Sequence, residues 1–269
     1  MTLTDWPADK LAEELERIAL AAGEVILRIY ESDFATQQKS DQSPVTEADV
    51  AAEALITAEL QRLTPEIPII AEEAAAAGGL PAEAAGRFWL VDPLDGTKEF
   101  IARNGEFTVN IALIEQGKPT LGVVHLPVLG QTYSSDGKVA CRRLTDGKRE
   151  IIHSRAVPSE GAVMMISRSH ADKELVKAGE LGETIIGTLV AGSSLKFCRL
   201  AEGVADIYPR FGTTMEWDTA AGHAVLAAAG GSVRQLDGMP LRYGKAGFRN
   251  PHFIARGRDR KPAAAKINA

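Results

Sequence analysis

The sequence predicts an α/β protein of the mixed α+β kind, and three features of the chain support this fold class. A long amphipathic segment at residues 8–31 predicts a helix. Apolar runs separated by glycine and proline turns predict strands between residues 68 and 134. From residue 162 onward, predicted strands and helices alternate, as they do when helices pack on a sheet. With 269 residues, the chain can form one large domain or two closely packed ones.

The first half opens with the most regular pattern in the chain, in which six apolar residues recur at helical spacing. They are Leu11, Leu15, Ile18, Ala22, Ile26 and Ile29. A polar stretch at 37–46 separates this helix from a second one at about 47–63. The other elements expected in this half are a strand at 68–73, a loop or short helix at 74–86, a strand from Trp89 to Val91, a hairpin of strands at 106–115 and 120–126, and an edge strand at 131–134.

A polar stretch at 146–160 is the expected junction between two halves of the chain. We therefore expect an N-terminal half at 1–150, a C-terminal half at 151–256 and a frayed tail at 257–269. The elements expected in the second half are strands at 162–167, 184–188, 206–208, 231–236 and 252–255, and helices at 171–180, 193–203 and 217–229.

Composition excludes several classes of protein. The net charge of −6 argues against a binder of nucleic acid polymers, which would carry a basic stripe. Two cysteines, Cys141 and Cys198, argue against a disulfide framework or a cysteine zinc site. The start of the chain lacks a signal-peptide pattern, and no apolar run is long enough to span a bilayer. We expect a cytoplasmic protein; peripheral association with the inner face of the cell membrane and a homodimer stay open.

Acidic residues follow three apolar runs: Glu72 with Glu73, Asp92 with Asp95, and Asp218. If these clusters converge, their charges need compensation, because an unpaired buried carboxylate is costly. Mg²⁺ is a natural partner, since it prefers oxygen ligands. Each cluster also has a simpler interpretation: a solvated surface for the glutamates, a turn between strands for residues 92–96, and a helix cap for Asp218.

Three motifs taken together resemble the inositol monophosphatase superfamily of magnesium-dependent, lithium-sensitive phosphatases. They are E-E at 72–73, D-P-L-D-G-T at 92–97 and W-D-T-A-A-G at 217–222. The resemblance extends from the first expected helix to Ala229. It implies a layered αβαβα sandwich of the inositol monophosphatase and sugar phosphatase type, with about two or three Mg²⁺ ions in each active site.

The resemblance also implies roles for single residues. The positions that match metal ligands are Glu72, Asp92, Leu94 through its carbonyl, Asp95 and Asp218. Asp49 and Thr97 match the pair that holds and deprotonates the attacking water, assisted by Glu72, while Glu73 stands behind the ligands. The V-T-E-A-D element at 45–49 departs from the family pattern, because Ser43 stands where the family often has an aspartate. This departure weakens that element and leaves the metal ligands unaffected.

Basic residues near predicted strand ends and helix starts indicate which kind of phosphate substrate binds. A second phosphate far from the metals needs its own cations, which Lys196 and Arg210 could provide. The pattern resembles the bacterial 3′(2′),5′-bisphosphate nucleotidase branch, in which the residues matching His170, Ser193, Lys196 and Arg210 contact the nucleotide. Inositol monophosphatases tend to have an acidic residue where Arg210 stands. The expected substrate contacts are Glu72, Leu94, Asp95, Gly96, Thr97, His170, Ser193, Lys196, Arg210 and Asp218.

The resulting prediction is hydrolysis of the 3′-phosphate of adenosine 3′,5′-bisphosphate, a small-molecule substrate, with Mg²⁺. Three alternatives stay open: action on 3′-phosphoadenosine 5′-phosphosulfate, an inositol or fructose 1,6-bisphosphate phosphatase, and a non-catalytic nucleotide sensor. Lys196 and His170 can also be read as a solvated helix lysine and a surface or capping histidine, and Lys39 as a weak phosphate contact or a solvated loop lysine. Core packing is the expected role of Phe197, Cys198, Leu200, Val204 and His223.

Overall fold

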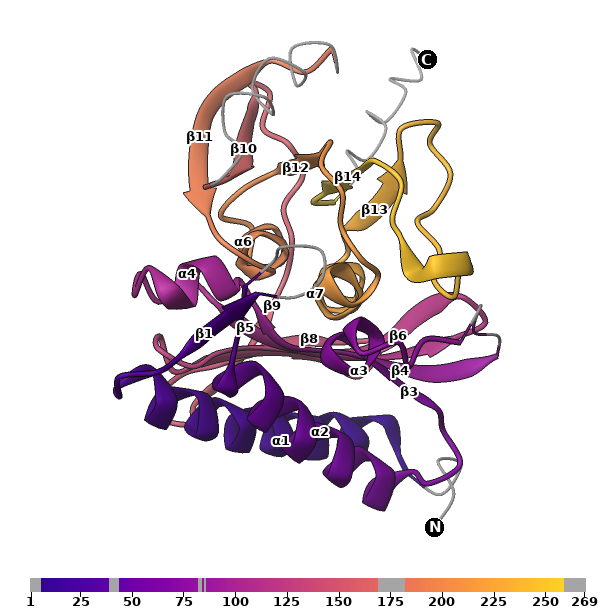
Figure 1. Cartoon of the computed structure of the whole chain (residues 1–269). Coiled ribbons are helices and arrows are strands. Elements are labelled where there is room, and N and C mark those ends of the chain that lie inside the picture. Colours follow the sequence, from indigo (N-terminus) through magenta and orange to yellow (C-terminus); the bar gives the residue numbers. More distant parts are fainter. Residues whose placement is uncertain (1–5, 39–43, 82–83, 85, 169–181, 259–269) are drawn as a thin grey trace, which may run out of the picture.

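The structure is a computed structural model that describes residues 6–38, 44–81, 84, 86–168 and 182–258. Two sheets and two pairs of helices form its layers (Figure 1). Helices α1 (Ala8–Tyr30) and α2 (Glu47–Leu63) cover one face of a seven-stranded sheet. Helices α6 (Leu195–Ala201) and α7 (Trp217–Ala228) lie between this sheet and a five-stranded sheet. These layers confirm the predicted fold class.

The seven-stranded sheet has the strand order β3-β4-β5-β6-β7-β8-β9. Only β3 and β4 run parallel, and all the other neighbours in it are antiparallel. Its strands are β3 (Ile69–Ala71), β4 (Arg87–Asp95), β5 (Thr108–Glu115), β6 (Lys118–Leu126), β7 (Gln131–Ser135), β8 (Ala140–Arg143) and β9 (Arg149–Ile152). Short elements beside it are β1 (Thr36–Gln38), β2 (Pro44–Thr46), α3 (Glu72–Ala76) and α4 (Thr97–Ile101).

The five-stranded sheet has the order β11-β10-β12-β14-β13. Its strands are β10 (Ala162–Ser167), β11 (Ile185–Ala191), β12 (Ile207–Arg210), β13 (Ser232–Gln235) and β14 (Phe253–Arg256). A 3₁₀ turn, η3 (Ala246–Phe248), precedes the last strand. Strands β10, β11 and β12 are parallel, so their carboxyl ends lie at one edge, next to the start of α6. The helix predicted at 171–180 lies outside the described residues.

Burial explains the layering. The apolar face of α1, which carries Leu15, Ile18 and Ile26, packs with α2 against Trp89 and Val91 of β4. The opposite face of the same sheet packs against α6, α7 and the second sheet in a larger core. Because α6 and α7 share that core with both sheets, the two halves of the chain are in direct contact. Within the described ranges, no helix is long and apolar enough to cross a membrane.

Four strands were missed by the sequence analysis: β1, β2, β8 and β9. The first two are three residues long, and β1 is fully exposed, so no alternation marks them. Strands β8 and β9 carry arginines that bind carboxylates of other elements. Arg142 donates to Glu202 and Glu150, and Arg149 to Glu16. Charged residues of this kind make strands near the end of a sheet look like loops in a sequence.

Candidate active site

Carboxylates from three separate segments converge between the two sheets. Glu72, Asp92 and Asp218 each offer one oxygen, and these oxygens lie within 4.8 Å of one another. Strands β3 and β4 are parallel neighbours with Ala71 opposite Val91, so Glu72 and Asp92 lie side by side. Asp218 comes from the first turn of α7. Its carboxylate accepts a hydrogen bond from the Met215 N–H at 2.8 Å.

A bulge in β4 explains how Asp95 joins this cluster. Two residues three positions apart would point to opposite faces of a regular strand. Asp92 pairs with Asn110 and Asp95 pairs with Thr108, so β4 advances three residues while β5 advances two. The extra residue shifts the alternation. Pro93 and Leu94 therefore form the bulge, and both aspartates can face one volume.

Electrostatics at the cluster favour a bound cation. Burial, reinforced by Glu72 and Asp95, raises the pKa of Asp92 well above its ordinary value. Burial and the same two neighbours raise the pKa of Asp218 in the same way. Burial also raises the pKa of Asp95 to about 6, against the opposing attraction of Lys196. The donor set consists of oxygens alone, which suits a hard divalent cation, so this cluster could hold a metal ion.

Asp49 and Thr97 are brought together beside the cluster. The Thr97 hydroxyl donates to Asp49 Oδ1 at 3.2 Å and lies 3.5 Å from the Leu94 carbonyl oxygen. The second oxygen of Asp49 accepts from both the N–H and the hydroxyl of Thr46, at 2.8 and 2.7 Å. This is a capping box at the start of α2. Asp49 is buried, so three donors fix its orientation.

Gly96 joins the bulge to α4 and has to be glycine. Its φ is +97°, in the left-handed region that other residues rarely adopt. A Cβ atom there would lie 3.4 Å from the carbonyl oxygen of Glu106, an ordinary van der Waals distance, so the backbone conformation and not a lack of space requires glycine. The backbone at 95–97 is therefore held closely against the segment that precedes β5.

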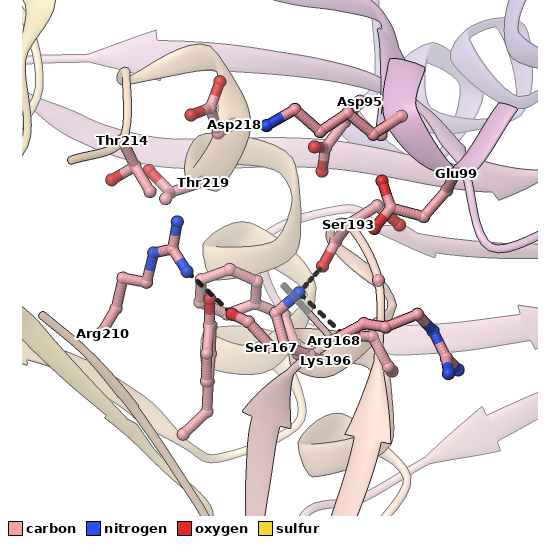
Figure 2. A pocket seen from close by; sticks show the side chains of 16 residues that line it. Asp95, Glu99, Ser167, Arg168, Ser193, Lys196, Arg210, Thr214, Asp218 and Thr219 are labelled. Atoms are coloured by element: carbon pink, nitrogen blue, oxygen red, sulfur yellow. Dashed lines mark hydrogen bonds between the residues drawn. The ribbon is translucent and has the colours of Figure 1, made fainter. Parts of the chain in front are cut away.

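A cavity of about 160 Å³ opens next to the carboxylates and extends toward the second sheet. Figure 2 shows Asp95 and Asp218 on one side of it, with Ser193, Lys196 and Arg210 facing them. A second cavity of about 530 Å³ shares Asp95, Gly96 and Asp218 with the first and reaches Glu72 and Thr97. Asp95 and Asp218 thus border two spaces: Lys196 and Arg210 line the first, and Glu72 and Thr97 line the second.

Lys196 lies in the first turn of α6, with only 5% of its surface exposed. Its ammonium donates to the carbonyl oxygens of Ser193 at 2.6 Å and Ala191 at 3.3 Å. It also lies 5.3 Å from the centre of the Tyr208 ring. The alternative of a solvated helix lysine is therefore wrong. Across the cavity, Arg210 donates to the Ser167 hydroxyl at 2.7 Å (Figure 2).

Two polar residues that the sequence analysis missed connect the two sides. Asn110 donates to Ser194 Oγ at 3.1 Å and to Asp95 Oδ2 at 3.4 Å. Ser194 in turn donates to the Asp218 backbone carbonyl at 2.8 Å. A buried asparagine in the middle of the apolar strand T-V-N-I-A-L-I is the signal that could have found this contact.

Most residues predicted to be structural lie in the core, with one exception. Phe197, Cys198 and Leu200 are buried, and His223 packs against Tyr243, whose hydroxyl is 3.0 Å from His223 Nδ1. The prediction for Val204 was wrong, since it is 44% exposed. It follows the end of α6, where the helical period no longer applies. His170 and Lys39 lie outside the described residues.

Comparison with known proteins agrees with this geometry. The model of the inositol monophosphatase family matches residues 8–266. A 3′(2′),5′-bisphosphate nucleotidase, CysQ of Escherichia coli strain K12, is 47% identical over 247 residues, which are 90% of this chain and 98% of that protein. The chain belongs to the inositol monophosphatase family.

Solved structures of inositol monophosphatase family members have the same fold. CysQ from Bacteroides thetaiotaomicron superposes with a TM-score of 0.74 at 39% identity, covering 90% of this chain and 95% of that one. The inositol monophosphatase of Anabaena sp. PCC 7120 gives a TM-score of 0.73 at 26% identity, covering 93% and 91%. Family members with different names thus share this architecture, so the fold alone does not identify a substrate.

Proposed function

We propose that the chain is a magnesium-dependent 3′(2′),5′-bisphosphate nucleotidase. It hydrolyses the 3′-phosphate of adenosine 3′,5′-bisphosphate with water, giving AMP and inorganic phosphate. The observation that carries this proposal is the pair of cations, Lys196 and Arg210, in the same cavity as Asp95 and Asp218. A monophosphate on the carboxylate side has no need of them, whereas a second phosphate does. Relatives named 3′(2′),5′-bisphosphate nucleotidase, at up to 48% identity, support the same substrate.

In this proposal the carboxylates bind the metals, and Asp49 and Thr97 move a proton. The metal ligands are Glu72, Asp92, Leu94 through its carbonyl, Asp95 and Asp218. Magnesium ions held there would lower the pKa of a water and neutralise charge on the phosphoryl and leaving oxygens. Thr97 passes its hydroxyl proton to Asp49 Oδ1 while it accepts one from the attacking water, and Glu72 assists.

The attacking water and the leaving 3′-oxygen lie on opposite sides of phosphorus in an in-line displacement. The two cavities suit this geometry, because Thr97 lines one and the two cations line the other. The backbone N–H groups of Gly96 and Thr97 are donors for the phosphoryl oxygens. Lys196, Arg210, Ser193 and His170 bind the AMP part. Water attacks directly, so no phosphoenzyme forms.

A substrate panel with wild-type protein and Arg210→Glu tests the proposal. The panel contains adenosine 3′,5′-bisphosphate, inositol 1-phosphate and fructose 1,6-bisphosphate, and the assay measures released phosphate. We expect the nucleotide to have the highest kcat/KM. Arg210→Glu should lower that value on the order of 100-fold, because it replaces a cation facing the 5′-phosphate with an anion. Hydrolysis of inositol 1-phosphate should change much less.

Two results would contradict the proposal. A preference of the wild-type protein for inositol 1-phosphate or fructose 1,6-bisphosphate would assign it to those activities. An equal loss on all substrates in Arg210→Glu would mean that Arg210 supports the site as a whole and does not recognise a second phosphate.

A further inference from the structure

One carboxylate outside the metal cluster joins the two halves of the site. Glu106 precedes β5, on the side of the large sheet. Its Oε1 accepts from Arg168 Nη2 at 2.6 Å, and its Oε2 accepts from Arg168 Nε at 3.0 Å and from the Gly192 N–H at 2.8 Å. Arg168 directly follows β10 and Gly192 directly follows β11. Glu106 therefore binds the ends of two neighbouring strands of the small sheet.

The backbone around Glu106 touches both loops that line the cavity. A Cβ atom on Gly192 would lie 2.9 Å from the Glu106 carbonyl oxygen, closer than real Cβ contacts allow. A Cβ atom on Gly96 would lie 3.4 Å from the same oxygen. Gly96 belongs to the loop of Asp95 and Thr97, and Gly192 leads into the turn that carries Lys196. Glu106 is thus one contact between the carboxylate loop and the lysine loop, in addition to the hydrogen bonds of Asn110 with Asp95 and Ser194.

The contact is ionic and directional. Burial alone would raise the pKa of Glu106, but the hydrogen bonds from Arg168 and the Gly192 N–H lower it below its ordinary value. The side chains of Arg168 and Glu106 are 47% and 22% exposed, and ion pairs as exposed as this contribute little to stability. A two-point arginine contact combined with a backbone donor instead fixes an orientation. In Figure 2 the Arg168 guanidinium points away from Lys196 and Arg210.

We propose that Glu106 is a positioning residue that sets the spacing between the metal centre and the second-phosphate site. The inference rests on the proposed nucleotidase function. The nucleoside fixes the distance between the two phosphates of the substrate, so both can bind only if the carboxylate loop and the lysine loop are correctly spaced. A substrate with one phosphate does not depend on this spacing. Glu106 therefore contributes to selectivity for bisphosphates without touching the substrate.

The test compares Glu106→Gln with the wild-type protein on two substrates that differ by one group. Adenosine 3′,5′-bisphosphate and adenosine 3′-monophosphate have the same nucleoside and the same scissile phosphate. Glutamine keeps the size of the side chain and loses the charge that orients Arg168. We expect KM for the bisphosphate to rise about tenfold with little change in kcat, which corresponds to ~1.4 kcal/mol. The kcat/KM for the 3′-monophosphate should stay within about twofold of wild type.

A matched control and a binding measurement separate positioning from folding. Glu115→Gln breaks the Arg87–Glu115 pair, which has the same N–O distance of 2.6 Å and side chains 43% and 32% exposed; both substrates should be unaffected. Calorimetry should show that Glu106→Gln binds AMP, which carries a single phosphate, as tightly as the wild-type protein does, which shows that the variant is folded and its lysine loop intact. If Glu106→Gln does not fold, Arg168→Gln breaks the same contact from its exposed side and should give the same pattern.

Two outcomes would overturn the inference. Equal losses on both substrates, or no loss on either, would mean that Glu106 does not set the spacing. A wild-type protein that shows no preference for the bisphosphate overturns the nucleotidase function itself, and the inference falls with it. If the wild-type protein prefers the bisphosphate and Glu106→Gln gives equal losses or no loss, only the inference about Glu106 is wrong, and the nucleotidase function stands.

Discussion

The arrangement of Asp92 and Asp95 depends on a single extra residue in β4. The motif D-P-L-D is visible in the sequence, but the alternation of a strand would separate its two carboxylates. The bulge opposite Asn110 and Thr108 resolves this conflict. In the folded protein the two charges are unfavourable without a cation, because burial and the nearby Glu72 raise the pKa values of both aspartates. The residues that suit metal binding are therefore a source of instability when no metal is bound.

Replacement of Asp95 by asparagine tests whether its charge supports activity and destabilises the metal-free protein. We expect the activity of Asp95→Asn to fall on the order of 1,000-fold or more, because the proposed metal ligand loses its charge. The metal-free protein should be as stable as wild type or more stable, since burial disfavours the charge that is removed. Thermal unfolding with and without MgCl₂ measures both effects. The stabilisation by Mg²⁺ should be smaller in the variant.

A surface substitution provides the control for Asp95→Asn. Asp146 is exposed and accepts a hydrogen bond from the Lys148 N–H in a turn. Asp146→Asn should therefore keep both activity and the Mg²⁺ response. Near-normal activity of Asp95→Asn at saturating Mg²⁺ would show that Asp95 is not a metal ligand.

At the scale of residues, the sequence predicts the carboxylates better than their partners. Glu72, Asp92 and Asp218 belong to motifs that are recognisable wherever they occur. Glu106 and Asn110 act through contacts with segments far away in the chain, at Gly192 and Ser194. No pattern in the neighbouring sequence indicates such a contact. These contacts are visible only in the tertiary structure, where the two sheets pack next to each other.

Helix α7 packs against both sheets, as α6 does, and its composition makes this possible. Its sequence, W-D-T-A-A-G-H-A-V-L-A-A, is mostly small residues. Gly122 of β6 packs against Ala221 and Ala224, and Gly222 of α7 packs against the Phe197 ring of α6. Small side chains at these points let helix and sheet approach closely. Because Asp218 begins this helix, the same packing fixes the last carboxylate of the cluster.

Gly122→Ala should therefore disturb both stability and the site. A Cβ atom there would lie 2.7 Å from the Ala221 carbonyl oxygen and from the Ala224 side chain. The backbone of α7 has to move, which we expect to cost ~1–3 kcal/mol of unfolding free energy. Urea unfolding measures this cost. The kcat of the variant should fall as Asp218 is displaced.

Gly187 of β11 is the appropriate comparison for Gly122. A Cβ atom on it meets nothing within 4 Å, and its φ lies outside the left-handed region. Gly187→Ala should change the unfolding free energy by less than about 0.5 kcal/mol. If Gly122→Ala is no more destabilising than Gly187→Ala, the contact between α7 and the sheet is looser than described.

Prediction of elements succeeded where periodicity is regular and failed where it is interrupted. Helices α1, α2 and α7 begin and end within about two residues of their expected limits, which is the usual uncertainty of helix ends. Strands β8 and β9 were missed because their arginines face carboxylates of α1 and α6, a cause that lies outside the strands themselves.

Protonation of buried groups links the stability of the whole molecule to pH. His125 of β6 is buried, and this burial lowers its pKa to about 4 from an ordinary 6.5. Its Nδ1 lies 2.9 Å from the Thr132 hydroxyl, while its other side faces Gly23 of α1. The unfolded chain binds a proton below pH 6.5, but the folded protein resists it until about pH 4. Stability is therefore lost as the pH falls from about 6.5 toward 4.

His125→Gln tests this linkage, because a glutamine does not titrate. Between pH 7 and pH 5 the wild-type protein should lose about 2 kcal/mol of unfolding free energy through His125. The difference in unfolding free energy between the wild type and the variant should therefore be smaller at pH 5 than at pH 7 by about 2 kcal/mol. Urea unfolding at the two pH values measures it. A difference that is independent of pH would show that His125 keeps an ordinary pKa in the folded protein.

For the molecule as a whole, family resemblance predicted the layered architecture. The distance between those layers could not be predicted. It depends on residues such as Glu106 and Gly122, which contact partners from the other half of the chain. The motifs therefore indicate the chemistry, and tertiary packing adjusts the cavity in which it takes place.

The late position of Asp218 in the chain also bears on how the protein is made. Ribosomes deliver Glu72, Asp92 and Asp95 long before α7, so a nascent chain holds an incomplete cluster. Domains generally fold as their residues emerge, and the large sheet is finished at Ile152. The helix that completes the cluster, α7, is synthesised after every strand of that sheet. A product terminated before α7 would carry the motif at residues 92–97 and lack the last carboxylate of the cluster.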